Sequence, residues 1–299
     1  MRELCERFLL HRESELSAGS LKIERSSLEH FASFCEERGF DFRELSREHL
    51  AAYLRVVPGG ISHRARAMRG VRGFCRWAQR AGHLLVDPGP FPIPRCRPTL
   101  PRVPSVDQML KLLEVPDTSE PLGLRDRLIL ELFYVLGLRR EECHRLDVEH
   151  LDLNQRTVRV VGKGDHERLL PLSPKLLETC LAYLEESRPK LMGAEVDPAL
   201  LVSKRKRKRR RLSGSFLGRV VKIAGQAIGL RLHPHLLRHA CATHLIEAGV
   251  DYRQVQELLG HAQLKSTSRY TQISPQSLRR EFFRCHPRAR FSEQNEEDA

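Results

Sequence analysis

The sequence lacks any run of about twenty apolar residues, the length that a helix needs to span a bilayer. Its N-terminal stretch, MRELCERFLLHRESE, carries charges within and after a short apolar segment, which is not typical of a secretory signal. Its eight cysteines lie far apart, with neither the paired spacing of a zinc site nor the density of a disulfide framework. We therefore expect reduced thiols in a cytoplasmic protein, without secretion or membrane insertion.

Two further motifs are missing. No GxxxxGK[ST] segment is present, and no group of carboxylates has a spacing suited to magnesium. We therefore expect neither a metal nor any other cofactor. What the sequence has in excess is positive charge: 51 Lys and Arg residues against 38 Asp and Glu give a net charge of +13. This balance indicates a polyanionic partner, although charge alone does not exclude a merely soluble basic protein.

Seven prolines lie between Pro88 and Pro104, in the segment PGPFPIPRCRPTLPRVP. Proline removes a backbone donor and favours an extended chain, and the whole chain is long enough for two domains. We therefore expect a linker here. The predicted organisation is an N-terminal helical domain over residues 1–87, the linker over 88–104, a second domain over 105–285 and a disordered acidic tail over 286–299.

Helical patterns dominate the first domain. Residues 21–38 place Ile23, Leu28, Phe31 and Phe34 near helical spacing, and a glycine follows as a stop. These four side chains are therefore candidates for the core of the first domain.

A second helical run, SHRARAMRGVRGFCRWAQR, covers residues 62–80, with Ser62 as its expected N-cap. Met68, Val71 and Cys75 fall on one side of this helix, and arginines fall on the other. Solvated helix faces normally mix both charges, but this run contains no acid, which favours contact with phosphates over simple solvation. Its basic residues are Arg64, Arg66, Arg69, Arg72, Arg76 and Arg80.

The second domain mixes two periodicities. Residues 124–136 predict an apolar helix, whereas 156–161 and 167–172 flank the turn GKGDH and predict a β-hairpin. The remainder returns to helices, with Gly249 and Gly260 as C-terminal stops. The predicted fold class is mainly α with a small antiparallel β-sheet.

The segment 232–274 concentrates the side chains that can carry chemistry. On a helix, His235 and Arg238 stand one turn apart on the same face, where an imidazole and a guanidinium can address one phosphate. His261 directly follows a glycine, and Tyr270 lies in a short polar segment beyond it. Each residue alone also has an ordinary structural explanation, so only the combination indicates a function.

Five motifs in order resemble those of the tyrosine recombinases, or phage integrase family, with Xer-like spacing. They are GLRREE from Gly137, the hairpin GKGDHERLLPL, HPHLLRHACATH, LLGHA and Tyr270. The resemblance spans nearly the whole chain, because the N-terminal helical region also resembles the core-binding domain of the family. It implies a two-domain DNA clamp whose second domain is catalytic.

The resemblance also implies roles for individual residues. The matched catalytic set is Arg139, Lys163, His235, Arg238, His261 and Tyr270, with Glu142 in a supporting position. Arg139 and Arg238 correspond to the arginines that grip the scissile phosphate, and Tyr270 corresponds to the nucleophile. Tyrosine is largely protonated near neutrality, so His235 is the expected base, and Lys163 on the hairpin tip is the expected acid for the departing 5′ oxygen.

Eight consecutive basic residues follow the hairpin region, and their mutual repulsion opposes packing into a core. We expect an exposed loop that contacts DNA without reading its sequence, although a solvated loop or a targeting signal would have the same composition. The run comprises Lys204, Arg205, Lys206, Arg207, Lys208, Arg209, Arg210 and Arg211.

The activity implied by the resemblance is site-specific recombination of double-stranded DNA, through a 3′-phosphotyrosine link, by a homo- or hetero-tetramer on two DNA sites in the nucleoid. Residues 276–285 then offer Leu278, Phe282 and Phe283 either to a neighbouring subunit or to their own. Two alternatives are a type IB topoisomerase and a DNA-binding regulator without catalysis. The motif spacing and the intact catalytic set favour the recombinase.

Overall fold

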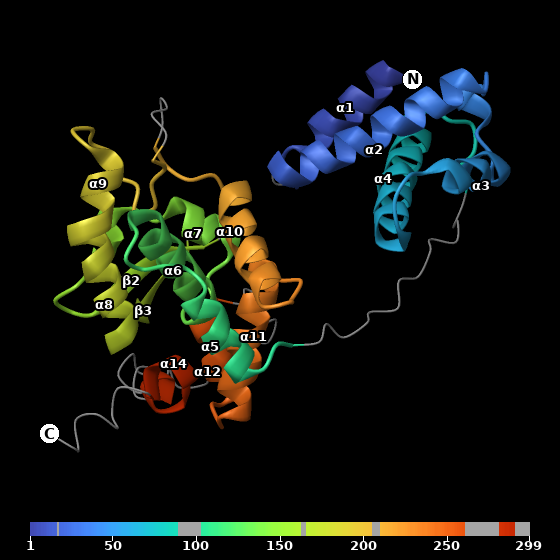
Figure 1. Cartoon of the computed structure of the whole chain (residues 1–299). Helices are drawn as coiled ribbons and strands as arrows, with labels where there is room; N and C mark the ends of the chain where they lie inside the picture. The colour runs from blue at the N-terminus through green and yellow to red at the C-terminus, as the bar shows by residue number, and fades with distance from the viewer. Residues whose placement is uncertain (17, 89–102, 163–165, 205–209, 261–280, 291–299) are drawn as a thin grey trace, which may run out of the picture. The chain divides into compact units, whose positions relative to one another are not determined.

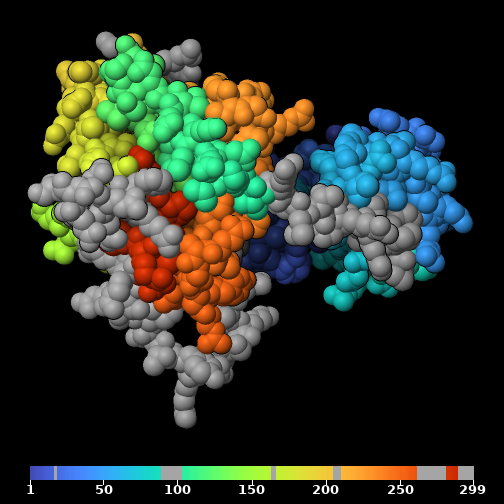
Figure 2. Space-filling view, turned by 60° about the horizontal axis from the view of Figure 1, so that its bottom comes forward, coloured from blue at the N-terminus to red at the C-terminus, as the bar shows by residue number. Residues whose placement is uncertain are grey.

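The computed structural model describes residues 1–16, 18–88, 103–162, 166–204, 210–260 and 281–290. The chain divides into two compact units, Met1–Leu100, coloured blue to teal, and Pro101–Ala299, coloured green to red (Figure 1, Figure 2). Each unit has a hydrophobic core of its own. Among the residues described, no helix has the length and apolar character needed to cross a membrane.

Unit 1 is helical throughout its described residues. Its helices are α1 (Arg2–Arg12), α2 (Ala18–Glu37), α3 (Arg47–Val56) and α4 (Ile61–Arg80), with a short 3-10 turn at Phe42–Glu44. Ser46 caps α3 by accepting a hydrogen bond from the backbone N–H of His49. The core is aromatic: Tyr53 and Phe31 meet edge to face with ring centroids 4.8 Å apart, and both are fully buried.

The predicted core of α2 is confirmed at Leu28, Phe31 and Phe34, which are buried, and is wrong at Ile23, which is 43% exposed. The reason is geometric. Ile23 precedes Leu28 by five residues, and at 3.6 residues per turn this separates the two side chains by roughly 140° around the helix.

Helix α4 starts two residues earlier than an N-cap at Ser62 predicts. Its N-cap is Gly60, in an extended conformation, so Ser62 lies inside the first turn and the prediction of a Ser62 cap is wrong. The predicted apolar side is confirmed, since Met68, Val71 and Cys75 are all buried. Unit 1 therefore packs one face of α4 into its core and leaves the arginine face outside.

Unit 2 is built around helix α6 (Pro121–Tyr134), whose residues from Leu128 to Tyr134 are fully buried. In the described part of unit 2, α6 packs against α5, α7, α8, α9, α10 and α11 (Figure 1). The helices around α6 are α5 (Val106–Glu114), α7 (Arg140–Arg145), α8 (Pro174–Ala182), α9 (Arg188–Met192), α10 (Gly214–Ala227), α11 (Pro234–Glu247), α12 (Tyr252–Leu259) and α14 (Pro287–Arg290), with a 3-10 turn at Val148–His150 and a π turn at Tyr183–Ser187. An apolar helix at the centre thus fixes the helices that carry the site.

A small antiparallel sheet lies beside these helices, in the order β1 (Leu151–Asp152), β2 (Thr157–Val161), β3 (Glu167–Pro171). Strands β2 and β3 form the predicted hairpin, which is confirmed, and Val160 pairs with Arg168. Alternate residues of β2 are buried, as expected for a sheet with one face on the core. The mainly helical fold class with a small sheet is also confirmed.

The prediction of a disordered tail over 286–299 is wrong for the first residues of that range. His286 is fully buried against the rings of Tyr134 and Phe282, and Arg288 pairs with Glu131 at 2.8 Å. The acid-rich composition that suggested a tail begins only beyond these residues, and 291–299 lie outside the described range. Phe282 is buried in the core of its own unit, which is the second of the two alternatives given for it; Leu278 is not among the described residues.

We predict that Arg288→Met destabilises unit 2, because Glu131 is fully buried and would keep only its ion pair with Arg127. Removing one partner of a buried pair costs about 3 kcal/mol, so amides of α6 should exchange with solvent roughly 100-fold faster in hydrogen-exchange experiments. The control is Arg284→Met, which removes an exposed pair with Glu281. Equal exchange in the two variants would contradict the prediction.

Candidate functional site

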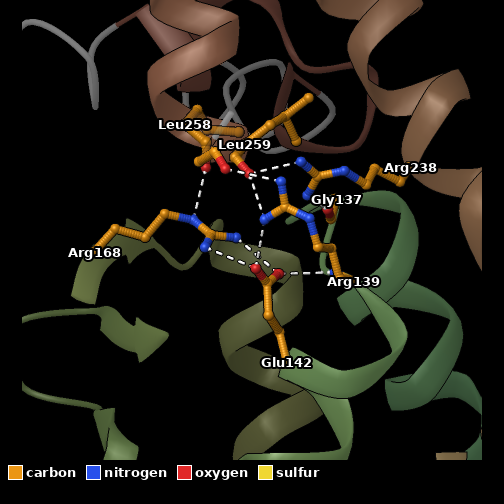
Figure 3. A network of polar contacts seen from close by, with 8 residues as sticks. Gly137, Arg139, Glu142, Arg168, Arg238, Leu258 and Leu259 are labelled. Carbon is orange, nitrogen blue, oxygen red and sulfur yellow. Dashed lines mark hydrogen bonds and ion pairs between the residues drawn. The ribbon is translucent and has the colours of Figure 1, made fainter. Parts of the chain in front are cut away.

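Three arginines and one carboxylate meet at the end of helix α12, where two of the arginines pair with the carboxylate and the third donates to backbone carbonyls (Figure 3). Gly137, with φ of +59°, turns the chain after α6, and Arg139 then caps α7. A side chain at Gly137 would not fit, since its Cβ would come 2.4 Å from Cδ2 of Leu259. The GLRREE motif therefore combines a required glycine with a helix start, and this places Arg139 and Glu142 beside α12.

Glu142 is the centre of the cluster and is only 4% exposed. Its carboxylate accepts hydrogen bonds from the backbone N and from Nη1 of Arg139, both at 2.8 Å. It also accepts from Nη1 and Nη2 of Arg168, at 3.0 and 2.9 Å. Burial alone would raise the pKa of Glu142, but the hydrogen bonds and charge of Arg168, together with those of Arg139, outweigh it and lower the pKa. Glu142 is therefore a buried carboxylate held in its charged form.

Arg238 approaches from α11 and is also buried. Its Nη1 donates to the carbonyl of Gly137 at 2.5 Å, and its Nη2 donates to the carbonyl of Leu259 at 2.6 Å. Burial and the nearby charge of Arg139 lower the pKa of Arg238 to about 10, so the guanidinium stays protonated at neutral pH.

The last carbonyls of α12 accept from all three guanidinium groups. Arg168 Nε donates to Leu258 at 3.0 Å, Arg139 Nη2 donates to Gly260 at 2.8 Å, and Arg238 donates to Leu259. These carbonyls have no partner within the helix and lie at its negative end, where cations are favoured. The end of α12 thus gathers the arginines before any anion binds.

Arg139 and Arg238, the two arginines predicted to bind phosphate, each have N–H groups that make no hydrogen bond to another described residue. A guanidinium has five N–H groups. Among the described residues, hydrogen bonds use three N–H groups of Arg139 and two of Arg238. The side chain of Arg139 is 39% exposed. Three arginines and one carboxylate also leave the cluster with an excess of two positive charges, so the arrangement can receive an anion such as a phosphate.

His235 lies one helical turn before Arg238 on α11, as predicted, and its side chain is exposed. Partial burial and then the positive charge of Arg238 lower its pKa from the ordinary value of 6.5. The imidazole is therefore mainly neutral at neutral pH, which is the form that can accept a proton. By contrast, His244 is buried between the hydroxyl of Tyr134 and the carbonyl of Pro104 and has a structural role.

The other three predicted catalytic residues, Lys163, His261 and Tyr270, lie outside the described residues. The residues that directly precede two of them are at the cluster. A Cβ on Gly162 would lie 3.7 Å from Oε1 of Glu142, and the carbonyl of Gly260 accepts from Arg139. The structure therefore brings Arg139, Glu142 and Arg238 together, with His235 one turn away, and leaves the rest of the set as a prediction.

The prediction of an exposed loop for the basic run, residues 204–211, is confirmed at one end and wrong at the other. Lys204 is exposed, as predicted, and residues 205–209 are outside the described range. The prediction of an exposed loop is wrong for Arg210, which is 4% exposed and pairs with Glu195, and for Arg211, which pairs with Asp147. Acids and backbone carbonyls from outside the run satisfy both guanidinium groups, which a count of local charge does not reveal.

The arginine side of α4 faces outward. Arg66, Arg69, Arg76 and Arg80 are exposed, whereas Arg72 is half-buried. Arg64 is also half-buried and donates from Nε to the carbonyl of Val57 at 3.1 Å. Four of the six predicted phosphate contacts are thus fully available at the surface of unit 1.

Within the described ranges of the chain, one group of residues has the composition of a metal site. Asp147, Glu149 and His150 bring potential ligand atoms within 4.8 Å of one another. However, Asp147 pairs with Arg211, and Nδ1 of His150 accepts from the backbone of Asp147. Two of the three ligands already have partners, and the prediction that no metal is needed stays a prediction.

Arg168 is the member of the cluster that the motifs did not identify. Its position in the predicted strand could have identified it from the sequence. Arg168 pairs with Val160, and Val158 pairs with Leu170, so Arg168 lies on the face of the hairpin that carries buried apolar residues. A charge on that face requires a buried partner, and Glu142 is that partner.

A buried arginine cluster with an excess of positive charge, in a mainly helical unit, favours binding of an anion such as a phosphate. Comparison with known proteins agrees: the model of the phage integrase family matches residues 103–277, and the chain belongs to this family. It is 37% identical over 274 residues to tyrosine recombinase XerC of Mycobacterium leprae, covering 89% of this chain and 90% of that protein. The predicted recombinase activity is thereby confirmed and fits better than either alternative.

Solved structures support the same fold. One is the XerH site-specific recombinase bound to its difH substrate, with a TM-score of 0.67 at 22% identity, covering 94% of this chain and 83% of that one. Another is a lambda integrase tetramer bound to a Holliday junction, with a TM-score of 0.66 at 18% identity, covering 91% and 79%.

We predict that His235 titrates below pH 6.5 in an NMR titration of its ring, because burial and Arg238 disfavour its charged form. Arg238→Gln should move the midpoint upward. The unfolded chain takes up this proton more readily than the folded one, so the contribution of His235 to stability is lost as the pH falls below 6.5. A midpoint at or above 6.5 in the unchanged protein would contradict the lowered pKa.

Proposed function

We propose that this protein cleaves and rejoins double-stranded DNA with Tyr270 as the nucleophile and with Arg139 and Arg238 on the scissile phosphate. The observation that carries this proposal is the convergence of Arg139 and Arg238, from separate helices, on the same helix end with N–H groups in reserve. Planar, permanently charged guanidinium groups match the oxygens of a phosphate, and a lysine would be a poor substitute.

In the proposed reaction, the phenol oxygen of Tyr270 attacks phosphorus and the bond to the 5′ oxygen breaks. His235 accepts the phenol proton, and Lys163 gives a proton to the departing 5′ oxygen. The negative charge that develops on the non-bridging oxygens is met by Arg139 and Arg238. The 3′-phosphotyrosine link keeps the energy of the broken bond, so the 5′ hydroxyl of a partner strand can reverse the step without hydrolysis.

The two units have different parts in the proposal. The arginine face of α4 in unit 1 contacts the DNA backbone, and unit 2 carries out the chemistry, with Lys204 and the basic residues at 205–209 as further backbone contacts. Arg210 and Arg211 are not part of this proposal, because they pair with Glu195 and Asp147. A first domain over 1–87, joined by the proline-rich linker to a second domain that begins at 105 and includes His286 and Arg288, is part of the proposal. The DNA-bound solved neighbours support a duplex as the partner, and the lambda integrase tetramer supports action as a tetramer on two sites. The proposed location is the cytoplasm, in association with the nucleoid.

We predict that the protein becomes covalently attached to a suicide duplex with a nick near the cleavage position, and that Tyr270→Phe does not. The nick lets the 5′ fragment leave, so the phosphotyrosine link accumulates and is seen as a slower band on a denaturing gel. Adduct formation by Tyr270→Phe would overturn the assignment of the nucleophile. Relaxation of supercoils without any recombinant product would instead favour the topoisomerase.

We predict that Arg69→Gln with Arg76→Gln weakens binding of duplex DNA and lowers the slope of log K against log salt by roughly 2, because about one counterion is released for each phosphate contact. The matched control is Arg2→Gln with Arg25→Gln, which removes the same charge from arginines of unit 1 that are paired with Glu36 and Glu6. Equal slopes for the two double variants would exclude a phosphate contact by α4.

A further inference from the structure

Arg168, on strand β3, is the third arginine of the cluster and uses all three of its side-chain nitrogens in hydrogen bonds within it. Nη1 and Nη2 hold the two oxygens of Glu142 at 3.0 and 2.9 Å, and Nε holds the carbonyl of Leu258 at 3.0 Å (Figure 3). All three of its nitrogens thus have a partner, and the side chain is 14% exposed. Arg168 therefore differs from Arg139, whose side chain is 39% exposed.

The guanidinium of Arg168 also lies beside two glycines that precede predicted catalytic residues. A Cβ on Gly260 would come 3.0 Å from Nη1 of Arg168, and a Cβ on Gly162 would come 3.8 Å from the same atom. Gly260 has a φ of +66°, so both its backbone conformation and the closeness of Arg168 favour glycine there. In sequence, Gly162 directly precedes Lys163, and Gly260 directly precedes His261.

Arg168 also balances the negative charge of Glu142. Glu142 holds Arg139 by its backbone and its side chain, but an unpaired carboxylate there would also cancel the positive charge of Arg139. Arg168 meets the carboxylate with two parallel hydrogen bonds, the strongest geometry for such a pair. Its effect on the pKa of Glu142 is larger than that of Arg139. Glu142 can thus orient Arg139 while its negative charge is balanced by another residue.

We propose that Arg168 is a positioning residue for DNA cleavage: it balances the charge of Glu142 and fixes the end of α12, so that Arg139 and Arg238 face the scissile phosphate with their positive charge intact. This inference rests on the proposed function, because it assigns a role within that reaction. Arg168 touches neither the phosphate nor the nucleophile in this role and acts through Glu142 and the carbonyl of Leu258.

The test is single-turnover cleavage of the nicked suicide duplex at saturating DNA, with duplex affinity measured separately. Arg168→Met should slow cleavage by about 10- to 100-fold, the usual cost of losing a residue that orients catalytic groups, and should leave the Kd for duplex nearly unchanged. Arg168→Lys keeps the charge but not the two parallel bonds, so its rate should lie between the two. The matched control is Arg159→Met, which removes an exposed arginine of the same hairpin that pairs with Glu167, and it should cleave at the normal rate.

A charge-balanced double variant separates this role from a purely structural one. Adding Glu142→Gln to Arg168→Met removes the carboxylate that Arg168 would have balanced, while the amide oxygen can still accept from Arg139. We expect the double variant to cleave faster than Arg168→Met alone. Losses that simply add would overturn the proposal, because they mean that the two residues act independently.

The cleavage assays distinguish failure of the role of Arg168 from failure of the proposed function on which it rests. If the unchanged protein forms no adduct, the proposed function fails, whatever Arg168 does. If the unchanged protein, Arg159→Met and Arg168→Met all cleave at the same rate, the positioning role of Arg168 is wrong and the proposed function stands. If Arg168→Met does not fold, Arg168→Lys decides, since cleavage at the normal rate by that variant would also overturn the role.

Discussion

The arrangement of unit 2 around the end of α12 depends on one ion cluster, formed by the buried carboxylate of Glu142 with Arg139 and Arg168. A buried carboxylate is costly unless it is paired and hydrogen-bonded, and here four hydrogen bonds from two arginines meet it. The pairing joins helix α7 to strand β3. Because Arg139, Arg168 and Arg238 also donate to the last carbonyls of α12, the elements α7, β3, α11 and α12 meet at one point.

This arrangement prepares the site before DNA arrives. The C-terminal carbonyls of α12 hold the guanidinium groups in place, so little reorganisation is needed when charge develops on a phosphate. The excess of two positive charges favours an anion, and the lowered pKa of His235 provides a neutral imidazole one turn from Arg238. A carboxylate is therefore useful in a site for phosphate only because Arg168 balances it.

Motifs in the sequence identified the arginines that can face the phosphate, Arg139 and Arg238, and patterns of hydrophobic residues predicted the helices and the hairpin. Residues whose role depends on distant partners were missed or misjudged. Arg168 lies within the hairpin motif, which suggested a role only for Lys163, and its partner Glu142 is 26 residues away. Arg210 belongs to a charge run that suggested a loop, yet Glu195 and backbone carbonyls hold it in the interior. His286 was assigned to the predicted tail although Phe282 and Phe283 shortly precede it, and its burial comes from the rings of Tyr134 on α6 and of Phe282.

The most direct measurement is a crystal structure of the Tyr270→Phe protein on an uncut duplex that carries its cleavage site. The expected result is a single phosphate that accepts hydrogen bonds from both Arg139 and Arg238, while Arg168 remains on Glu142. A structure in which these two arginines contact separate phosphates, or in which the scissile phosphate touches neither, would contradict the central claim.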